Sequence, residues 1–368
     1  MERIINRGTV DLRKDKGLNM DRARIGIIGV GWWGTVGHLE PLSHDDKADI
    51  VAVFSRTEEK AKDRAARYGV PAYYTDYRAL IDESDLDGVI IATTPNVHYE
   101  QARYALEHGL HVLMEKPFVL QAEHAEELAR LAEERELILS VCHPVLFHPW
   151  MKQARQQLRK DILGDVLMIS ALFSQRVYDL YRGDVSAAFD ERAGGGYPRP
   201  NRSSYSDPSI VGGGEGHTQA SHLIGSVLWL TELSPVSVYA QMNALDVEVD
   251  VVDAILVRFD NGALCTLTAN GLLPRGVSSR HIQIQGDKGI LAMDTLNGSA
   301  LFHLDADEGP QPFEKPPRFE TREGPPRNFV RTILGEETLY ADTQVAIDEV
   351  RILDAAYRSA ESGEAIQI

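Results

Sequence analysis

Three glycines, Gly29, Gly31 and Gly34, follow the apolar residues 25–28 at the spacing Gly-x-Gly-x-x-Gly. At this spacing the first glycine permits a tight turn, the second lets the backbone approach a pyrophosphate, and the third lets a helix pack against the strand. The N–H groups at the start of that helix can bind phosphate oxygens. A glycine-rich turn that binds no ligand is the alternative. The motif predicts a dinucleotide site made by Gly29, Gly31, Trp32, Trp33 and Gly34.

Ser55 and Arg56 lie where a dinucleotide domain usually places the side chain that reads the adenosine ribose, about twenty residues beyond the glycine turn. An acidic residue there would accept hydrogen bonds from the ribose hydroxyls and repel a 2′-phosphate. A hydroxyl and a guanidinium instead suit a 2′-phosphate. We therefore expect NAD(P) as the cofactor, with a preference for NADP. In the alternative, Arg56 stacks on the adenine and the site takes NAD or both.

Glu115, Lys116 and Pro117 directly follow the apolar residues 111–114. If that run is a strand of an open parallel sheet, these residues lie at the edge where such sheets bind ligands. An ammonium group there can stabilise the alkoxide that develops while a hydroxyl group is oxidised. From its position alone, Lys116 could equally be a surface cation without a role.

The order of the expected elements predicts the fold that would position these residues. Short apolar runs alternate with helical patterns through the first 142 residues, and this alternation is typical of a doubly wound parallel sheet. The expected strands are residues 25–28, 50–54, 89–91, 111–114 and 138–141, with helices near 97–108 and 121–135.

The second half of the sequence has a different pattern. Short turns such as Asp260-Asn261-Gly262 favour hairpins between strands, so we expect a large, mainly antiparallel sheet with helices on one face. The other face is a candidate surface for a homodimer or homotetramer, with an ordinary solvated face as the alternative. The expected strands are residues 235–243, 251–259, 263–270, 279–286 and 289–294, and the expected helices lie near 149–160, 215–230 and 343–362.

These patterns give an α/β fold class in three parts. Residues 1–21 form an N-terminal extension, residues 22–142 an NAD(P)-binding Rossmann domain, and residues 143–368 an α+β domain for substrate binding and oligomerisation. The proline-rich residues 310–326 are expected to cross the surface of the second domain.

The composition limits the classes of partner. The chain has 368 residues and a formal net charge of −17, which argues against nucleic acid and anionic membranes because both favour clustered lysine and arginine. The sequence has no run of about 18 apolar residues that would predict a membrane span. Its first twenty residues lack the apolar centre of a secretory signal. Cys142 and Cys265 fit no Cys-x-x-Cys pattern, and the histidines have no ligand spacing. We expect a cytoplasmic protein with reduced cysteines and no metal.

Together with the glycine turn, Glu115-Lys116-Pro117 resembles the signature of the glucose-fructose oxidoreductase, inositol dehydrogenase and rhizopine-catabolism family (Gfo/Idh/MocA). The resemblance extends along almost the whole chain from residue 22. It includes Thr-Thr-Pro-Asn-Val-His at residues 93–98, three glycines at 212–214 ahead of a helix ending in Leu-Trp-Leu at 228–230, and the closing residues 353–363.

The resemblance implies a Rossmann domain, a second domain whose sheet often mediates dimers, and NAD(P)-dependent oxidation or reduction of a sugar, sugar derivative or cyclitol. It implies that Lys116 hydrogen-bonds the reacting hydroxyl and that a cis peptide bond precedes Pro117. It also implies that Asn96 and His98 lie along the nicotinamide. The cofactor-binding residues that it adds are Thr93, Thr94, Asn96, His98, Glu115 and Lys116.

In this family a helix carries Asp-x-x-x-His, and the histidine is the usual acid/base. Counting from the three glycines places the histidine at His222 and the aspartate at Thr218, which departs from the family pattern. Helical spacing puts Thr218, Gln219 and His222 on one side and directs His217 away. We expect His222 to be the base, with a lowered pKa because the carboxylate is missing. A structural core histidine is the alternative.

The loop at residues 178–207 mixes aromatic and hydrogen-bonding side chains, which suit a polyhydroxylated ring. Surface loops also carry such residues without a function. Arg182 and Tyr197 belong to this loop. The expected substrate-binding residues are Lys116, Tyr181, Arg199, Tyr205, Asp207, Thr218, Gln219 and His222.

Three functions stay open at this point. The first is an NAD(P)-dependent dehydrogenase or reductase acting on a secondary hydroxyl or ketone of a sugar-like substrate. The second is an enzyme that keeps its cofactor bound and uses transient oxidation to cleave a glycoside or epimerise a sugar. The third is a non-catalytic NAD(P)-binding regulator, which the missing aspartate favours and the intact Glu115-Lys116-Pro117 disfavours.

Overall fold

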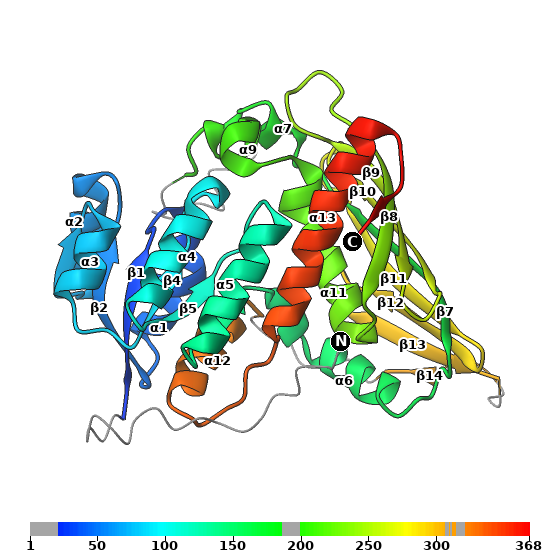
Figure 1. Cartoon of the computed structure of the whole chain (residues 1–368), viewed down its shortest axis with the longest axis horizontal. Coiled ribbons are helices and arrows are strands. Elements are labelled where there is room, and N and C mark those ends of the chain that lie inside the picture. Colours follow the sequence, from blue (N-terminus) through cyan, green and yellow to red (C-terminus); the bar gives the residue numbers. More distant parts are fainter. Residues whose placement is uncertain (1–20, 186–198, 306–308, 310, 314–320) are drawn as a thin grey trace.

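The computed structural model describes residues 21–185, 199–305, 309, 311–313 and 321–368 (Figure 1). Its first half is a parallel six-stranded sheet with the strand order β3-β2-β1-β4-β5-β6. The order reverses direction between β1 and β4, where open sheets of this kind bind their ligands. The strands are β1 (Ala23–Ile28), β2 (Ala48–Phe54), β3 (Ala72–Tyr74), β4 (Gly88–Ile91), β5 (His111–Met114) and β6 (Leu139–Val141).

Helices cover both faces of this sheet (Figure 1). Local sequence signals set their ends: Asp76 accepts a hydrogen bond from the backbone of Arg78 and begins α3, and Gly69 ends α2 with a φ of 69°. The helical elements are η1 (Gly34–Leu39), α1 (Glu40–Ser43), α2 (Glu58–Tyr68), α3 (Tyr77–Glu83), η2 (Pro95–Val97), α4 (His98–Glu107) and α5 (Ala122–Glu134).

The second half is a nine-stranded sheet with the order β14-β13-β12-β11-β7-β10-β9-β8-β15. Every pair is antiparallel except β7 with β10, so the prediction of a mainly antiparallel sheet is confirmed. The strands are β7 (Val166–Ser174), β8 (Pro235–Asn243), β9 (Val252–Phe259), β10 (Leu264–Asn270), β11 (Ser279–Gly286), β12 (Gly289–Asp294), β13 (Ser299–Leu304), β14 (Gln311–Pro312) and β15 (Ile366–Gln367).

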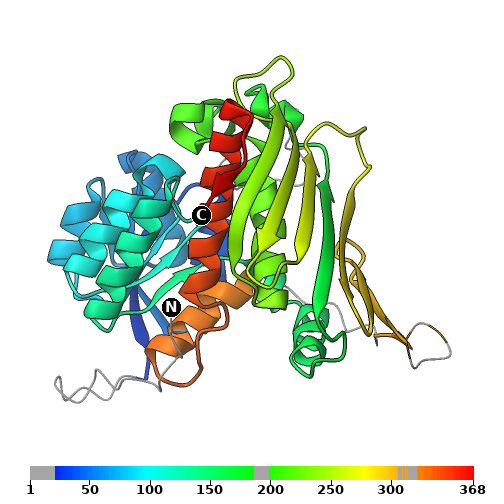
Figure 2. The ribbon, with the colours of Figure 1, turned by 45° about the vertical axis from the view of Figure 1, so that its right-hand side comes forward.

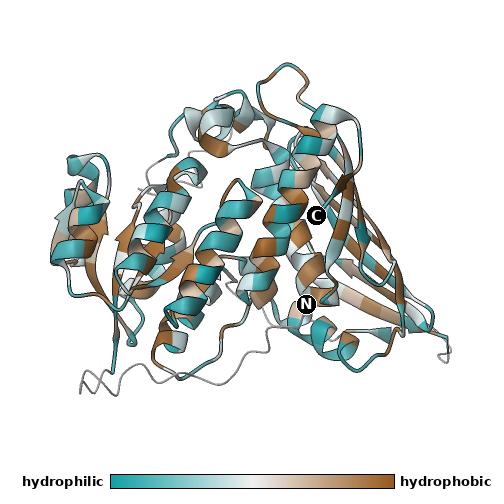
Figure 3. Cartoon of the chain, viewed as in Figure 1, coloured by the Kyte–Doolittle hydropathy of each residue, from teal (hydrophilic) through white to brown (hydrophobic). Residues whose placement is uncertain are grey.

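Two helices pack against this sheet, and one of them, α13, also contacts the Rossmann domain (Figures 1 and 2). The helix α11 is buried on nearly all sides, and α13 packs against α5, α11, β6 and β8. Figure 3 shows apolar residues on the surfaces that these elements turn toward one another. The helical elements of this half are η3 (Pro144–Phe147), α6 (Pro149–Leu158), α7 (Tyr178–Tyr181), α9 (Ser203–Ser206), α10 (Pro208–Val211), η5 (Gly216–Ala220), α11 (Ser221–Thr231), η6 (Thr321–Glu323), α12 (Gly324–Ile333) and α13 (Thr343–Ser362).

The helix α12 differs from the sequence expectation. The sequence analysis placed residues 310–326 at the surface of the second domain, but Pro325 and Pro326 are buried in the first turn of α12. Proline suits that position because the first N–H groups of a helix need no partner within it. Phe329 and Val330 then fill the core of the Rossmann domain beside β1 and β5. The Rossmann core therefore includes a helix from the far end of the second domain.

Candidate active site

A cavity of about 930 Å³ lies between the carboxyl edge of the Rossmann sheet and the inner face of the second sheet. Its walls come from the glycine turn, the ends of β2, β4 and β5, the helix α9, the start of α11, and the strands β7 and β11. The sequence-predicted residues that line it are Gly29, Gly31, Trp32, Trp33, Ser55, Arg56, Thr93, Thr94, Glu115, Lys116, Arg199, Tyr205, Thr218, Gln219 and His222.

The glycine turn has the geometry that a pyrophosphate needs. Gly29 has a φ of 104°, and a Cβ atom there would lie 2.6 Å from the carbonyl oxygen of Ala92. A Cβ atom on Gly34 would collide with the carbonyl oxygen of Gly29, so η1 can pack on the strand only without a side chain. A Cβ atom on Gly31 would meet nothing within 4 Å, because this residue faces the open cavity. The residues present therefore fit a dinucleotide.

Two cations stand at the far end of the cavity. Ser55 and Arg56 follow β2, and Lys60, one turn into α2, lines the same wall. The hydroxyl of Ser55 accepts a hydrogen bond from the backbone N–H of Thr57 at 3.3 Å. The sequence reasoning missed Lys60, although its position four residues after Arg56 on a helical pattern could have found it.

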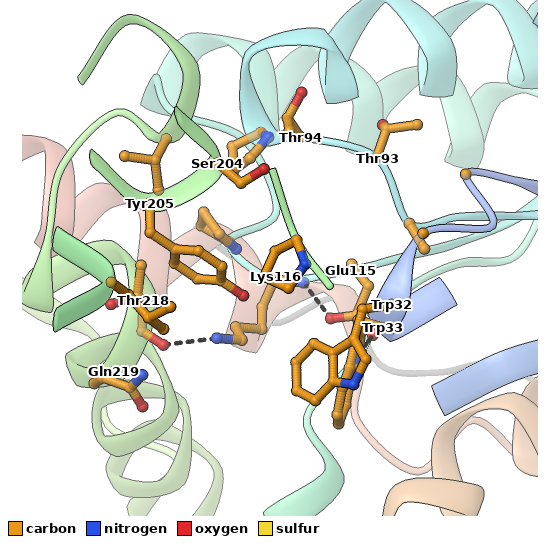
Figure 4. Close-up of a pocket in the computed structure, with 18 of the residues that line it drawn as sticks. Trp32, Trp33, Thr93, Thr94, Glu115, Lys116, Ser204, Tyr205, Thr218 and Gln219 are labelled. Atoms are coloured by element: carbon orange, nitrogen blue, oxygen red, sulfur yellow. Dashed lines mark hydrogen bonds between the residues drawn. The ribbon is translucent and has the colours of Figure 1, made fainter. Parts of the chain in front are cut away.

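Glu115 follows the strand β5, and its hydrogen bonds fix the backbone that carries Lys116. Its carboxylate accepts hydrogen bonds from Trp33 at 2.6 Å, from His38 at 2.8 Å and from the backbone of Lys116 at 3.2 Å (Figure 4). Burial raises its pKa, but the hydrogen bond and charge of His38 with the charge of Lys116 outweigh this and hold the pKa below its usual value. The carboxylate is therefore ionised and fixed. The peptide bond from Lys116 to Pro117 is cis.

Behind Glu115 lies a cluster of residue types that can bind metals, whereas the sequence predicted no metal site. Ligand atoms of His38, Glu115 and Cys142 lie within 4.8 Å of one another, and all three residues are buried. The cluster includes the hydrogen bond from His38 to Glu115, and burial raises the pKa of the Cys142 thiol well above its usual value. Cys142 and Cys265 are both free and buried.

Lys116 reaches across the cavity to the second domain. Its ammonium donates a hydrogen bond to the carbonyl oxygen of Thr218 at 2.6 Å (Figure 4). Burial lowers the pKa of Lys116, while the carboxyl groups of Glu115, Glu349 and Glu215 oppose that shift. The result is a partly desolvated cation at the centre of the cavity.

A buried hydrogen-bond network surrounds Thr218, the residue at which the resemblance placed the family's aspartate. Thr218 donates to the carbonyl oxygen of Gly214 at 2.7 Å, and the hydroxyl oxygen of Tyr181 lies 2.5 Å from the Thr218 hydroxyl and 2.8 Å from a carboxyl oxygen of Glu215. Burial raises the pKa of Glu215 to about 8, so this acid is mostly protonated at neutral pH. Tyr181 is 1% exposed and supports Thr218 from behind instead of lining the cavity, which corrects its predicted contact with a substrate.

His222 lines the cavity on α11, beside Phe173. Burial lowers the pKa of its imidazole well below the usual value, and the positive charges of Lys116, His143 and Arg280 add to this shift. No hydrogen bond to its ring is made by the part of the chain that the structure describes. The ring is thus neutral near pH 7 and able to accept a proton. His217 instead stacks on Tyr357 with ring centroids 4.6 Å apart.

Several predicted residues lie elsewhere. His98 is 1% exposed, and its ring contacts the carbonyl oxygens of Pro117 and Phe118 at 3.0 and 3.1 Å. It therefore supports the backbone that follows Lys116. Asn96 is exposed and accepts from the hydroxyl of Thr94 at 2.8 Å. Asp207 begins α10 by accepting from the backbone of Ser209. Helix-end and loop geometry, which the sequence does not display, decides these positions.

Arg182 and Tyr197 are two further residues of the predicted loop at 178–207. Arg182 lies over the ring of Tyr178, outside the cavity wall. Tyr197 lies outside the described residues.

The cavity also contains residues that the sequence reasoning did not select. Phe173 on β7, Gln175 just after it, and Arg280 on β11 line the wall formed by the second sheet. No motif marks them, because a strand residue's direction depends on the pairing register of the folded sheet.

Comparisons with known proteins agree with this geometry. Residues 23–143 match the oxidoreductase family with an NAD-binding Rossmann fold, and residues 151–292 match the GFO/IDH/MocA C-terminal domain. The chain is 25% identical to D-xylose 1-dehydrogenase (NADP(+)) 2 of Haloferax volcanii, over 94% of this chain and 98% of that protein. It is 27% identical to scyllo-inositol 2-dehydrogenase (NADP(+)) IolU of Bacillus subtilis, over 74% and 76%.

The solved structures agree in fold. Levoglucosan dehydrogenase in complex with NADH and levoglucosan has a TM-score of 0.80 at 19% identity, over 94% of this chain and 99% of that one. An oxidoreductase domain protein from Kribbella flavida has a TM-score of 0.81 at 21% identity, over 95% and 100%. At this identity the likeness concerns the fold alone. With both family domains matched in order along one continuous chain, the protein belongs to the GFO/IDH/MocA family of NAD(P)-dependent oxidoreductases.

Proposed function

We propose that this protein oxidises a secondary hydroxyl group, or reduces the corresponding ketone, on a sugar, sugar derivative or cyclitol. The observation that carries the proposal is that Lys116 and His222 line the same cavity as the glycine turn. The relatives named as xylose and inositol dehydrogenases support the class of substrate.

His222 and Lys116 have different roles at the reacting hydroxyl group. When bound, the nicotinamide would accept or return the hydride. His222 takes the hydroxyl proton, because its lowered pKa keeps the imidazole neutral near pH 7. Lys116 donates to the same oxygen and stabilises the charge that develops there. Glu115, held by Trp33 and His38, fixes the backbone from which Lys116 extends.

We also propose NADP as the preferred cofactor. Gly29, Gly31 and Gly34 would hold the pyrophosphate. Arg56 and Lys60 offer two cations near the place of the adenosine ribose, and no acidic residue follows β2 directly. Guanidinium and ammonium groups favour a 2′-phosphate.

The most direct test is a panel of sugars, cyclitols and glycosides with each cofactor, followed by the absorbance of the reduced nicotinamide. For a substrate that reacts, Lys116→Ala and His222→Ala should each lower turnover by roughly 10²-fold or more. Lys62→Ala and His303→Ala serve as controls, because both side chains are exposed and lie outside the cavity wall.

Each alternative has its own result in this test. Full activity of His222→Ala would place the base elsewhere. Cofactor-dependent glycoside cleavage or sugar epimerisation without net reduction of the cofactor would favour the transient-redox enzyme. Cofactor binding without turnover of any compound would favour the regulator.

A second proposal concerns assembly. We infer that the chain forms a homodimer or homotetramer through the outer face of the second sheet. Leu256 on β9, Leu264 on β10 and Met168 on β7 are 41%, 49% and 44% exposed on that face. Leu264 and Met168 are direct neighbours in the sheet, so their side chains form a continuous apolar surface.

A further inference from the structure

Arg280 narrows the class of substrate that the cavity can bind, an inference that rests on the proposed function. This arginine extends from β11 into the cavity wall, on the same sheet face as its cross-strand neighbour Phe173. Its guanidinium carbon lies 4.2 Å from the centre of the Phe173 ring, and that ring is the neighbour of His222, with ring centroids 6.4 Å apart. The guanidinium therefore stands one aromatic ring away from the proposed base.

The guanidinium is held firmly but is not neutralised. One terminal nitrogen donates to the side-chain oxygen of Gln175 at 2.5 Å, and the ring of Phe173 supports the flat face. The backbone carbonyl of Arg280 accepts from the N–H of Thr295 at 2.9 Å, which fixes the strand at this point. Its Nε is buried and has no hydrogen-bond partner among the described residues. A ligand in the cavity can therefore reach Arg280 only through the terminal nitrogens of the guanidinium, one of which already donates to Gln175.

The nearby acids do not balance this charge. In the part of the chain that the structure describes, no carboxylate lies within ion-pair distance of Arg280, whereas Arg176 and Arg275 both pair with Asp179. Glu215 acts on Arg280 only through its charge at longer range, and burial raises its pKa to about 8. At neutral pH the wall formed by the second sheet therefore presents Arg280 as a cation that no described carboxylate pairs with, whereas the charge of Lys116 is opposed by the ionised Glu115.

We propose that Arg280 binds an anionic oxygen group, a carboxylate or a phosphate ester, on the sugar-like substrate. The geometry gives the group a place beside Phe173, with the reacting carbon nearer to His222 and Lys116. A flat guanidinium that carries no ion pair suits a carboxylate or phosphate oxygen better than a neutral hydroxyl. The substrate class is then a sugar acid or a sugar phosphate.

Binding, measured by calorimetry on the full chain saturated with NADP, tests this inference. The probes are D-glucose as the neutral parent, D-gluconate and D-glucuronate as carboxylates at the two ends, and D-glucose 6-phosphate as the phosphate ester. We expect at least one anionic probe to bind about 10-fold or more tightly than D-glucose, since a hydrogen bond to a charged group has that magnitude. The probe that binds tightest identifies the anion.

Arg280→Gln should reduce this preference to about 3-fold or less, and Arg280→Lys should retain an intermediate preference because it keeps the charge and loses the fork. Arg275→Gln is the matched control, because this arginine is exposed, paired with Asp179 and outside the cavity wall. If Arg280→Gln fails to fold by circular dichroism, Arg280→Lys carries the test alone.

Three results would overturn the proposal: no anionic probe binds, D-glucose binds as tightly as every anion, or the preference survives in full in the Arg280 variants. Because binding is measured and not turnover, these results are distinct from a failure of the proposed function. If the protein binds D-glucuronate through Arg280 but oxidises no compound, the proposal for Arg280 is supported. The proposed oxidation of a sugar-like substrate is then contradicted.

Discussion

Arg56 and Lys60 are two cations that line the cavity near the proposed place of the adenosine ribose. Replacing both with alanine should raise the dissociation constant for NADP by about 10-fold or more and leave that for NAD nearly unchanged, because only NADP has the 2′-phosphate. Fluorescence titration with each cofactor measures this. Lys62→Ala, on the same helix but facing solvent, is the control.

Equal losses for both cofactors would instead show that Arg56 stacks on the adenine. In the native chain, NAD binding at least about tenfold tighter than NADP binding would reverse the proposed preference.

The pH dependence of oxidation should follow His222 and Lys116. The pKa of His222 lies below its usual 6.5, so the neutral base persists as the pH falls through 6.5 and kcat/KM decreases only in more acidic solution. The pKa of Lys116 lies below its usual 10.5, so the protonated donor is lost, and the rate falls, before the pH reaches that value. A pH profile of kcat/KM measures both limbs. An acidic limb that stays in place in His222→Ala would contradict this assignment.

The residues that sequence reasoning found and missed differ in a physical way. Lys116 and the glycines belong to motifs in which neighbours along the chain fix one another's positions. Tyr181, Arg280 and Glu215 act through neighbours from distant parts of the sequence. Their roles depend on which face of a strand or helix they occupy, and that is decided only when the strands pair.

At the scale of elements, the hairpin at residues 279–294 was the most predictable part of the second sheet. Residues 279–286 and 289–294 were expected as strands and are β11 and β12 with those bounds, because the turn between them and the alternating apolar residues both specify a hairpin. The strands β13, β14 and β15 were not foreseen, and neither was the short strand β3. It has three residues at the sheet edge, too few to show a period.

The outer face of the second sheet carries its own prediction. If Leu256 and Leu264 form the contact between copies, the double change to glutamate should convert the assembly to single chains, because burying the new charges without partners is unfavourable. Light scattering during size-exclusion chromatography gives the mass. Leu245→Glu is the matched control, since this leucine is 48% exposed in the connection from β8 to β9. A native chain that is monomeric at micromolar concentration would contradict the proposed assembly.

At the scale of the whole molecule, the active site depends on contact between the two halves. Lys116 follows the strand β5 of the Rossmann sheet, and the carbonyl oxygen that accepts from its ammonium belongs to Thr218 in η5, just before α11. The helix α13 packs on both halves and fixes their separation. Among the helices that the structure describes, none has the length and apolar character needed to cross a membrane.

The late helix α12 also sets an order of events during synthesis. The ribosome completes residues 22–142 long before it reaches Phe329 and Val330, yet these two side chains fill part of the core that the early strands enclose. Until they emerge, β1 and β5 lack part of their cover, and the nucleotide-binding half waits in an incomplete state. A chain translated only as far as residue 142 therefore lacks two side chains of the core against which β1 and β5 pack.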